Sequence, residues 1–194
     1  MKNIRLFLLV TSILNITLAY SQTTGVFADS RDGQEYKTVE FDGKIWLSKN
    51  LNFKARGSWC YDNKESNCDK YGRIYDWQTV MNGIEMPGNK GICPEGWHVA
   101  TFEEWQMLSN KYDKTKDLLA GGVSGFNILF AGCRFPNGNF EFENQAATFW
   151  TSTIDESDDK YVYTIYAYSD KVSKSLTGYS TNKTYGQYLR CVKD

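Results

Sequence analysis

The sequence predicts one α+β domain in which two main helices pack on twisted antiparallel sheets. Several short segments alternate large and polar residues, as strands with one buried face do, and residues 161–168 show this most clearly. Turn dipeptides at 42–43 and 137–138 separate strand-like segments. Residues 101–104 have the S/T-x-x-E spacing of a helix capping box.

The first 21 residues have the three parts of a secretion signal. Lys2 and Arg5 give a positive start, residues 6–19 are an apolar stretch, and 19–21 form a small-x-small cleavage site. The apolar stretch is shorter than the roughly 20 residues of a membrane-spanning helix. We therefore expect residues 1–21 to be removed. The mature chain, 22–194, is then a single domain that is secreted, periplasmic or on the cell surface, with no membrane span.

Charge and aromatic content narrow the classes of partner. The chain has 22 Lys or Arg against 23 Asp or Glu, and two of the bases leave with the signal. Nucleic acids and anionic membranes need a basic surface, so neither is an expected partner. The 6 Trp, 13 Tyr and 11 Phe supply large contact areas instead. Such rings suit stacking on sugars or packing against another protein.

The elements follow from local patterns. Residues 26–47 are expected to form short antiparallel strands, and 60–68 a polar loop bounded by two cysteines. Ile74, Trp77 and Met81 fall on one helical face and predict a helix over 74–81. The second helix begins at Thr101. The later strands are expected at 126–132, 140–142, 149–153, 161–168 and 186–192.

The residues that carry nucleophilic or metal chemistry are few. Five cysteines suit two bridges and one free thiol, and the absence of a CxxC pair beside a single histidine argues against structural zinc. A catalytic set would need His98 or Cys133. His98 lies between Trp97 and Val99 in a core-like strand, and Arg134 points away from Cys133 on a strand. We expect no catalytic residue.

A series of sequence marks in fixed order resembles the Fibrobacter succinogenes major paralogous domain, from about residue 27 to 194. The marks are DSRDG (29–33), WLSKNL (46–51), GSWCY (57–61), YGRIYDW (71–77), CPEGWHV (93–99), AGCR (131–134), FWTST (149–153) and LRCVKD (189–194). The resemblance implies a bacterial secreted or cell-surface module. A more distant similarity implies a C-type-lectin-like fold, shared with the formylglycine-generating enzymes.

The disulfide pattern rests partly on this resemblance. The loop between Cys60 and Cys68 is short enough for its ends to meet at bridging distance. In a lectin-like fold the segment before the Thr101 helix lies beside the last strand, which implies a Cys93–Cys191 bridge. The family pattern has no thiol at position 133, so Cys133 is expected to be free and to act as a small core residue.

Ligand-binding residues are expected on a loop-rich surface built by residues 136–186. The candidate ligand-binding set is Trp150, Tyr166, Tyr168 and Tyr185. Tyr161 and Tyr163 would share one strand face and Tyr166 and Tyr168 the other, unless a bulge shifts the phase. The sugar-binding signatures of calcium-dependent lectins are absent. No cofactor is expected, and calcium would have only one candidate loop, with Asp155, Asp158 and Asp159.

The preferred hypothesis is a secreted or cell-surface, non-catalytic module that binds carbohydrate or protein. The alternatives are an enzyme of the formylglycine-generating-enzyme-like branch and a structural component of the cell envelope. Burial of His98 and Cys133 among apolar residues would remove the candidates on which the enzyme hypothesis depends.

Overall fold

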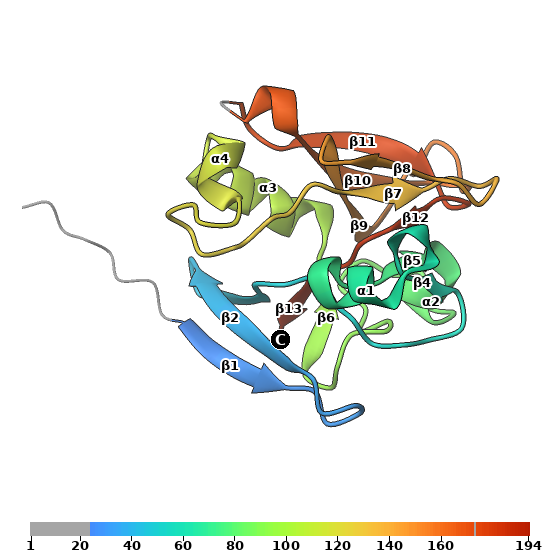
Figure 1. Cartoon of the computed structure of the whole chain (residues 1–194), viewed down its shortest axis with the longest axis horizontal. Coiled ribbons are helices and arrows are strands. Elements are labelled where there is room, and N and C mark those ends of the chain that lie inside the picture. The colour runs from blue at the N-terminus through green and yellow to red at the C-terminus, as the bar shows by residue number, and fades with distance from the viewer. Residues whose placement is uncertain (1–23, 173) are drawn as a thin grey trace, which may run out of the picture.

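The computed structural model describes residues 24–172 and 174–194, so the predicted secretion signal at 1–21 lies outside the described residues. The chain is a mixed α+β protein built mostly of two sheets (Figure 1). The first sheet has the order β1-β2-β3-β13-β6. Its strands are β1 (Thr24–Ala28), β2 (Glu35–Phe41), β3 (Lys44–Leu47), β6 (Trp97–Val99) and β13 (Cys191–Lys193).

The second sheet has the order β11-β10-β9-β7-β12-β5-β4, and β8 pairs with β7. The named strands of both sheets pair antiparallel except β7 with β9. The strands of the second sheet are β4 (Ser58–Trp59), β5 (Ile74–Asp76), β7 (Ala131–Arg134), β8 (Phe140–Glu143), β9 (Ala146–Ile154), β10 (Tyr161–Tyr168), β11 (Thr177–Asn182) and β12 (Gly186–Gln187).

Four α-helices accompany the sheets in the described ranges, where the sequence predicted two. They are α1 (Glu65–Tyr71), α2 (Trp77–Met81), α3 (Phe102–Lys111) and α4 (Thr115–Leu118). Short 3-10 turns occupy Tyr61–Asn63 and Ser169–Lys171. None of the described helices combines the length and the apolar run that a bilayer crossing requires.

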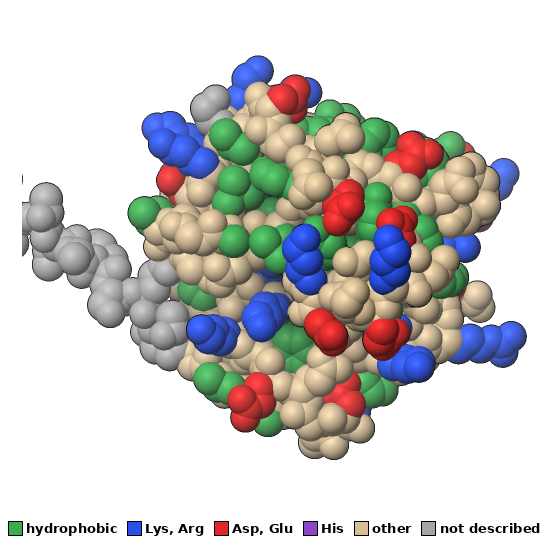
Figure 2. All heavy atoms as spheres, viewed as in Figure 1, with side chains coloured by type: hydrophobic (Ala, Val, Ile, Leu, Met, Phe, Trp, Pro, Cys, Tyr) green, Lys and Arg blue, Asp and Glu red, His purple; other side chains and the backbone are tan. Residues whose placement is uncertain are grey.

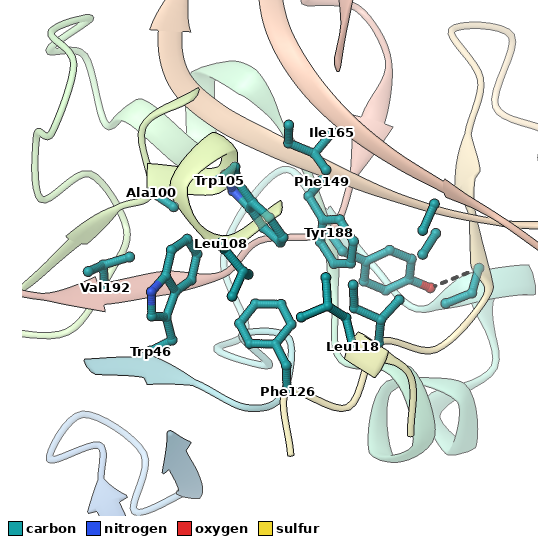
Figure 3. Packing of buried hydrophobic residues seen from close by; sticks show 14 of the residues in the cluster. Trp46, Ala100, Trp105, Leu108, Leu118, Phe126, Phe149, Ile165, Tyr188 and Val192 are labelled. Atoms are coloured by element: carbon teal, nitrogen blue, oxygen red, sulfur yellow. Dashed lines mark hydrogen bonds between the residues drawn. The ribbon is translucent and has the colours of Figure 1, made fainter. Parts of the chain in front are cut away.

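Helix α3 joins the two sheets through one aromatic core. The predicted capping box is present, because Thr101 Oγ1 accepts from the Glu104 amide and the Glu104 carboxylate accepts from the Thr101 amide. Trp105 and Leu108 point from the helix toward Trp46 and Phe126 (Figure 3). The Trp105 ring lies 5.1 Å from that of Trp46 and 5.5 Å from that of Phe126. Aromatic pairs at this separation add to the free energy gained by burial.

The predicted helix over 74–81 is wrong in its first turn. Residues 74–76 form strand β5, and the helix begins only at Trp77. Asp76 is the N-cap, because its Oδ1 accepts from the Thr79 amide at 2.7 Å. Ile74 and Tyr75 are both fully buried. Burial on both strand faces produced the apolar spacing that resembled a helix.

Three other predicted elements also differ. The segment before β7 is irregular, so the strand expected over 126–132 begins only at Ala131. The strand expected over 186–192 is divided into β12 and β13, which belong to different sheets. The loop expected over 60–68 contains a 3-10 turn and the start of α1.

Two disulfides cross-link the fold in the pairs expected from the sequence. The short-range bridge, Cys60–Cys68, has a Cα separation of 4.9 Å. The long-range bridge, Cys93–Cys191, spans 98 positions and has a Cα separation of 5.9 Å. It ties the segment before β6 to the last strand, which pairs with β6. Cys133 is free and buried.

Candidate functional site

An open groove with a volume of about 390 Å³ lies on the second sheet, over β10 and β11. The lining residues come from strands β10 and β11, the β7–β8 hairpin and the segment before β12. Figure 1 shows where these segments lie in the fold. Its lining is mostly aromatic. The ring-bearing residues are Phe135, Phe142, Tyr161, Tyr166, Tyr168, Tyr179 and Tyr185. We call this feature the tyrosine groove.

The alternation of β10 places tyrosines on both faces of the sheet. Tyr163 faces α3, where its ring stacks on Phe102 with centroids 4.8 Å apart. Tyr166 and Tyr168 line the groove, with their rings stacked at 5.8 Å. The antiparallel register pairs Thr164 with Tyr179, and this brings the Tyr179 ring to 5.1 Å from that of Tyr166. Tyr161 lines the groove with Tyr166 and Tyr168, because the pairing of β10 with β9 shifts register between Val162 and Thr164. The expected grouping of Tyr161 with Tyr163 is therefore wrong, and the groove is built on this irregularity and on the pairing with β11.

The other wall comes from the hairpin. The Phe135 ring lies 5.8 Å from that of Phe142 and 5.0 Å from that of Tyr185. Phe142 is 41% exposed and Tyr179 is 43% exposed, although both are large aromatics. Exposed rings gathered around one hollow are typical of binding sites.

The groove is electrically neutral. Among the described residues that line it there is no Asp, Glu, Lys, Arg or His, and the polar lining consists of Ser180, Thr181 and Asn182. Burial raises the pKa of Tyr166 and of Tyr168, so both phenols stay protonated at neutral pH. Hydroxyl and amide groups therefore surround an aromatic surface that has no charged side chain in its lining. Such a lining suits a ligand without net charge.

The structure brings together three of the four expected ligand-binding residues. Tyr166, Tyr168 and Tyr185 line the groove and are half-buried. Trp150 lies elsewhere. It is fully buried, its indole Nε1 donates to the Tyr75 carbonyl at 2.8 Å, and its ring lies 5.5 Å from that of Trp77. Trp150 is a core residue in this fold and contributes no groove surface.

Sequence reasoning left out Tyr161, Tyr179, Phe135 and Phe142, all of which line the groove. Tyr179 reaches the groove through the pairing of β11 with β10, which local periodicity does not reveal. The turn at 137–138 is the one sequence signal that pointed to Phe135 and Phe142, because it predicts a hairpin that carries both rings to one side.

His98 lies in the other sheet, away from the groove, and both of its ring nitrogens are engaged. Nδ1 lies 2.6 Å from an Asp194 carboxylate oxygen, and Nε2 lies 3.1 Å from each carboxylate oxygen of Glu104. The hydrogen bond with Glu104 is the main cause that raises the pKa of His98. The residue is 8% exposed. This arrangement holds a histidine between two acids and leaves neither nitrogen open to a substrate.

Cys133 lies in the lining of the groove but is buried. Burial raises the pKa of its thiol to about 12. A nucleophilic cysteine needs the opposite, a lowered pKa from nearby cations or a helix N-terminus. His98 and Cys133 belong to strands of different sheets, so they form no thiol–imidazole pair.

The acidic loop after β9 borders the groove. Asp155 Oδ1 accepts from the amide and the hydroxyl of Ser157, and Oδ2 accepts from the Ser180 hydroxyl. These bonds lower the pKa of Asp155. Asp158 accepts from the Lys160 amide, and Asp159 is exposed. Within the described ranges the one cluster with metal-ligand spacing is Cys60, Glu65 and Cys68, and its two thiols are joined as the short-range bridge.

Comparison with known proteins gives one match. The family model described as the Fibrobacter succinogenes major domain matches residues 19–193, which is most of the chain. No curated protein and no solved structure matches. The family description names a domain and no activity, so function has to be argued from the groove.

Proposed function

The chain belongs to the Fibrobacter succinogenes major domain family, and from that premise we propose that it is a non-catalytic, exported binding module that holds a carbohydrate in the tyrosine groove. Two disulfides support an exported location, because such bonds persist in oxidising compartments. The C-type-lectin-like fold is part of the proposal. It is supported by the mixed α+β architecture and by the long-range bridge from the segment before α3 to the last strand.

The observation that carries the proposal is the neutral aromatic lining. A sugar ring has one face of C–H groups, which packs on an aromatic ring, and hydroxyls at its edge. Tyr166, Tyr168 and Tyr179 supply the rings. At the rim the Ser180 oxygen can accept a hydrogen bond, since its own proton goes to Asp155, and the Asn182 amide can donate one, since its oxygen already accepts from Thr184. Both kinds of contact are needed to hold a sugar, and both are present within one hollow.

Size favours carbohydrate over a folded protein partner. A hollow of about 390 Å³ lies within the roughly 300–1,000 Å³ range of small-ligand sites. A stable protein interface buries about 800 Å² on each partner and needs a much larger flat patch. The engaged state of His98 and the protonated, buried thiol of Cys133 support the non-catalytic part of the proposal.

The experiment is a glycan array on the mature chain, with and without calcium, followed by titration of the bound glycan. Tyr179→Ala removes the most exposed tyrosine of the groove and should weaken binding about tenfold while the melting temperature changes little. Met107→Ala, on α3 and 51% exposed, is the matched control and should bind as wild type. Unchanged binding by Tyr179→Ala would place the ligand elsewhere and refute the proposal.

A further inference from the structure

A second cavity, of about 360 Å³, lies between β2, the segment that follows β3, the C-terminal end of α1 and the 120–129 segment. It shares no lining residue with the tyrosine groove. Figure 2 shows both basic and acidic side chains on the face of the molecule that carries β2 and α1. This side of the molecule therefore carries charged groups, which the lining of the tyrosine groove lacks.

Arg190 contributes a buried positive charge to the cavity lining. Its guanidinium donates from Nε to Asn50 Oδ1 at 2.7 Å, and from Nη1 to the carbonyls of Leu47 and Phe126 at 2.8 and 2.9 Å. Nη2 donates to the Asn127 carbonyl at 3.1 Å. All four acceptors are neutral, and Arg190 is 1% exposed. Burial lowers its pKa to about 9, which reflects a charge that no carboxylate offsets.

Three lysines, Lys37, Lys49 and Lys70, line the same cavity. None of them forms an ion pair with an acid in the described part of the chain, whereas five other lysines do: Lys44, Lys64, Lys90, Lys111 and Lys183. Lys70 lies over the Tyr71 ring at 4.3 Å. The cavity also has two exposed acids, Glu35 and Asp69, so its four cations exceed its carboxylates.

The cavity wall carries hydrogen-bonding groups whose capacity the protein does not use. Ser48 is 2% exposed, and its buried hydroxyl has no hydrogen-bond partner. The hydroxyl of Tyr36 accepts from the Asn52 amide at 3.0 Å and still has its own proton to donate. The side-chain oxygen of Asn52 is also buried without a partner. Both unpartnered atoms have almost no accessible surface, and the Asn52 oxygen is an acceptor that an anion cannot satisfy. The attraction for an anion therefore has to come from the cations of the cavity.

We propose that this cavity binds a small ligand through an oxyanion, either a carboxylate or a sulfate group. Lys49 and Lys37 hold the anion from the rim, and Lys70 adds a third ammonium group. Arg190 acts from the lining through its uncompensated charge. Hydrogen bonds to an ionised acceptor are stronger than neutral ones, so an anion uses these donors better than an uncharged sugar does. The inference does not rest on the tyrosine groove.

The test is calorimetric titration of the mature chain with sodium glucuronate, sodium sulfate and glucose, at ionic strength matched with sodium chloride. We expect glucuronate or sulfate to bind and glucose not to bind. The tighter of the two anions identifies whether the natural group is a carboxylate or a sulfate. Glucose binding as tightly as glucuronate, or neither anion binding above the chloride background, would overturn the proposal.

Three substitutions test whether the anion binds in this cavity. Lys37→Ala removes an exposed lysine that forms no ion pair in the described part of the chain, so it should leave the melting temperature almost unchanged and weaken anion binding about tenfold. Lys49→Ala should weaken binding and reduce its dependence on salt. Lys54→Ala, an exposed lysine outside the cavity, removes the same charge and should bind as wild type. Equal anion affinity in all three variants would refute the assignment.

Discussion

Glu104→Gln tests the buried charge cluster around His98. The Glu104 carboxylate is 8% exposed. It contacts His98 Nε2 at 3.1 Å, Lys44 Nζ at 3.0 Å and the Thr101 amide at 3.0 Å. Burial alone would raise the pKa of Glu104, but the hydrogen bonds from these three partners outweigh burial and hold it at about 2. Glutamine keeps the shape and an oxygen that can accept from the Thr101 amide, so the substitution removes mainly the charge.

The expected loss of stability follows from the shift in the pKa of Glu104. A fall from 4.5 to about 2 corresponds to about 3 kcal/mol of stability at neutral pH. Because the folded-state pKa is depressed, this contribution is complete above pH 4.5 and is lost as the pH falls toward 2. Wild type should therefore lose about 3 kcal/mol more than Glu104→Gln over that interval. Urea unfolding at a series of pH values measures the difference.

Glu103→Gln is the matched control, because Glu103 is the exposed neighbour on the same first turn of α3. It should lose stability with falling pH in parallel with wild type. The same series offers a second readout, since the Glu104 hydrogen bond is the main cause that raises the pKa of His98. Proton NMR should show a lower His98 pKa in Glu104→Gln. Parallel unfolding curves for wild type and Glu104→Gln from pH 4.5 to 2 would refute the reasoning.

Three further predictions concern stability and reactivity. Replacing both cysteines of the long-range bridge with alanine should cost about 4.7 kcal/mol of unfolding free energy, against about 2.5 for the short-range bridge, and thermal melting of the two variants ranks them. Trp150→Ala should cost about 3–5 kcal/mol in urea unfolding because the side chain is fully buried; a loss below 1 kcal/mol would contradict its core position. Cys133 should resist a thiol reagent in the folded protein and react once urea unfolds it, and rapid labelling of native protein would show that the thiol is accessible.

Local chemistry made several features predictable. The capping box at Thr101 involves residues three positions apart, and the strand over 161–168 follows from its own residue types, although its alternation is interrupted between Val162 and Thr164. Neither needs knowledge of distant segments. The family assignment was equally accessible, because it depends on the order of motifs along the chain. The same local rules failed at 74–76, where both strand faces are buried and the alternation that marks a strand disappears.

The candidate sites required tertiary structure, for a physical reason. By itself, the sequence determined the α+β class, the start of α3 and the tyrosines of β10. The pairing of β10 with β11 is a long-range choice that brought Tyr179 beside Tyr166. Contacts of β9 with Tyr75 and Trp77, equally distant in sequence, placed Trp150 in the core. Arg190 entered the second cavity in the same way, because its acceptors come from segments 64 and 140 positions away. Burial and hydrogen-bond satisfaction depend on neighbours that are distant in sequence, so only the folded chain decides which charges and hydroxyls remain without partners.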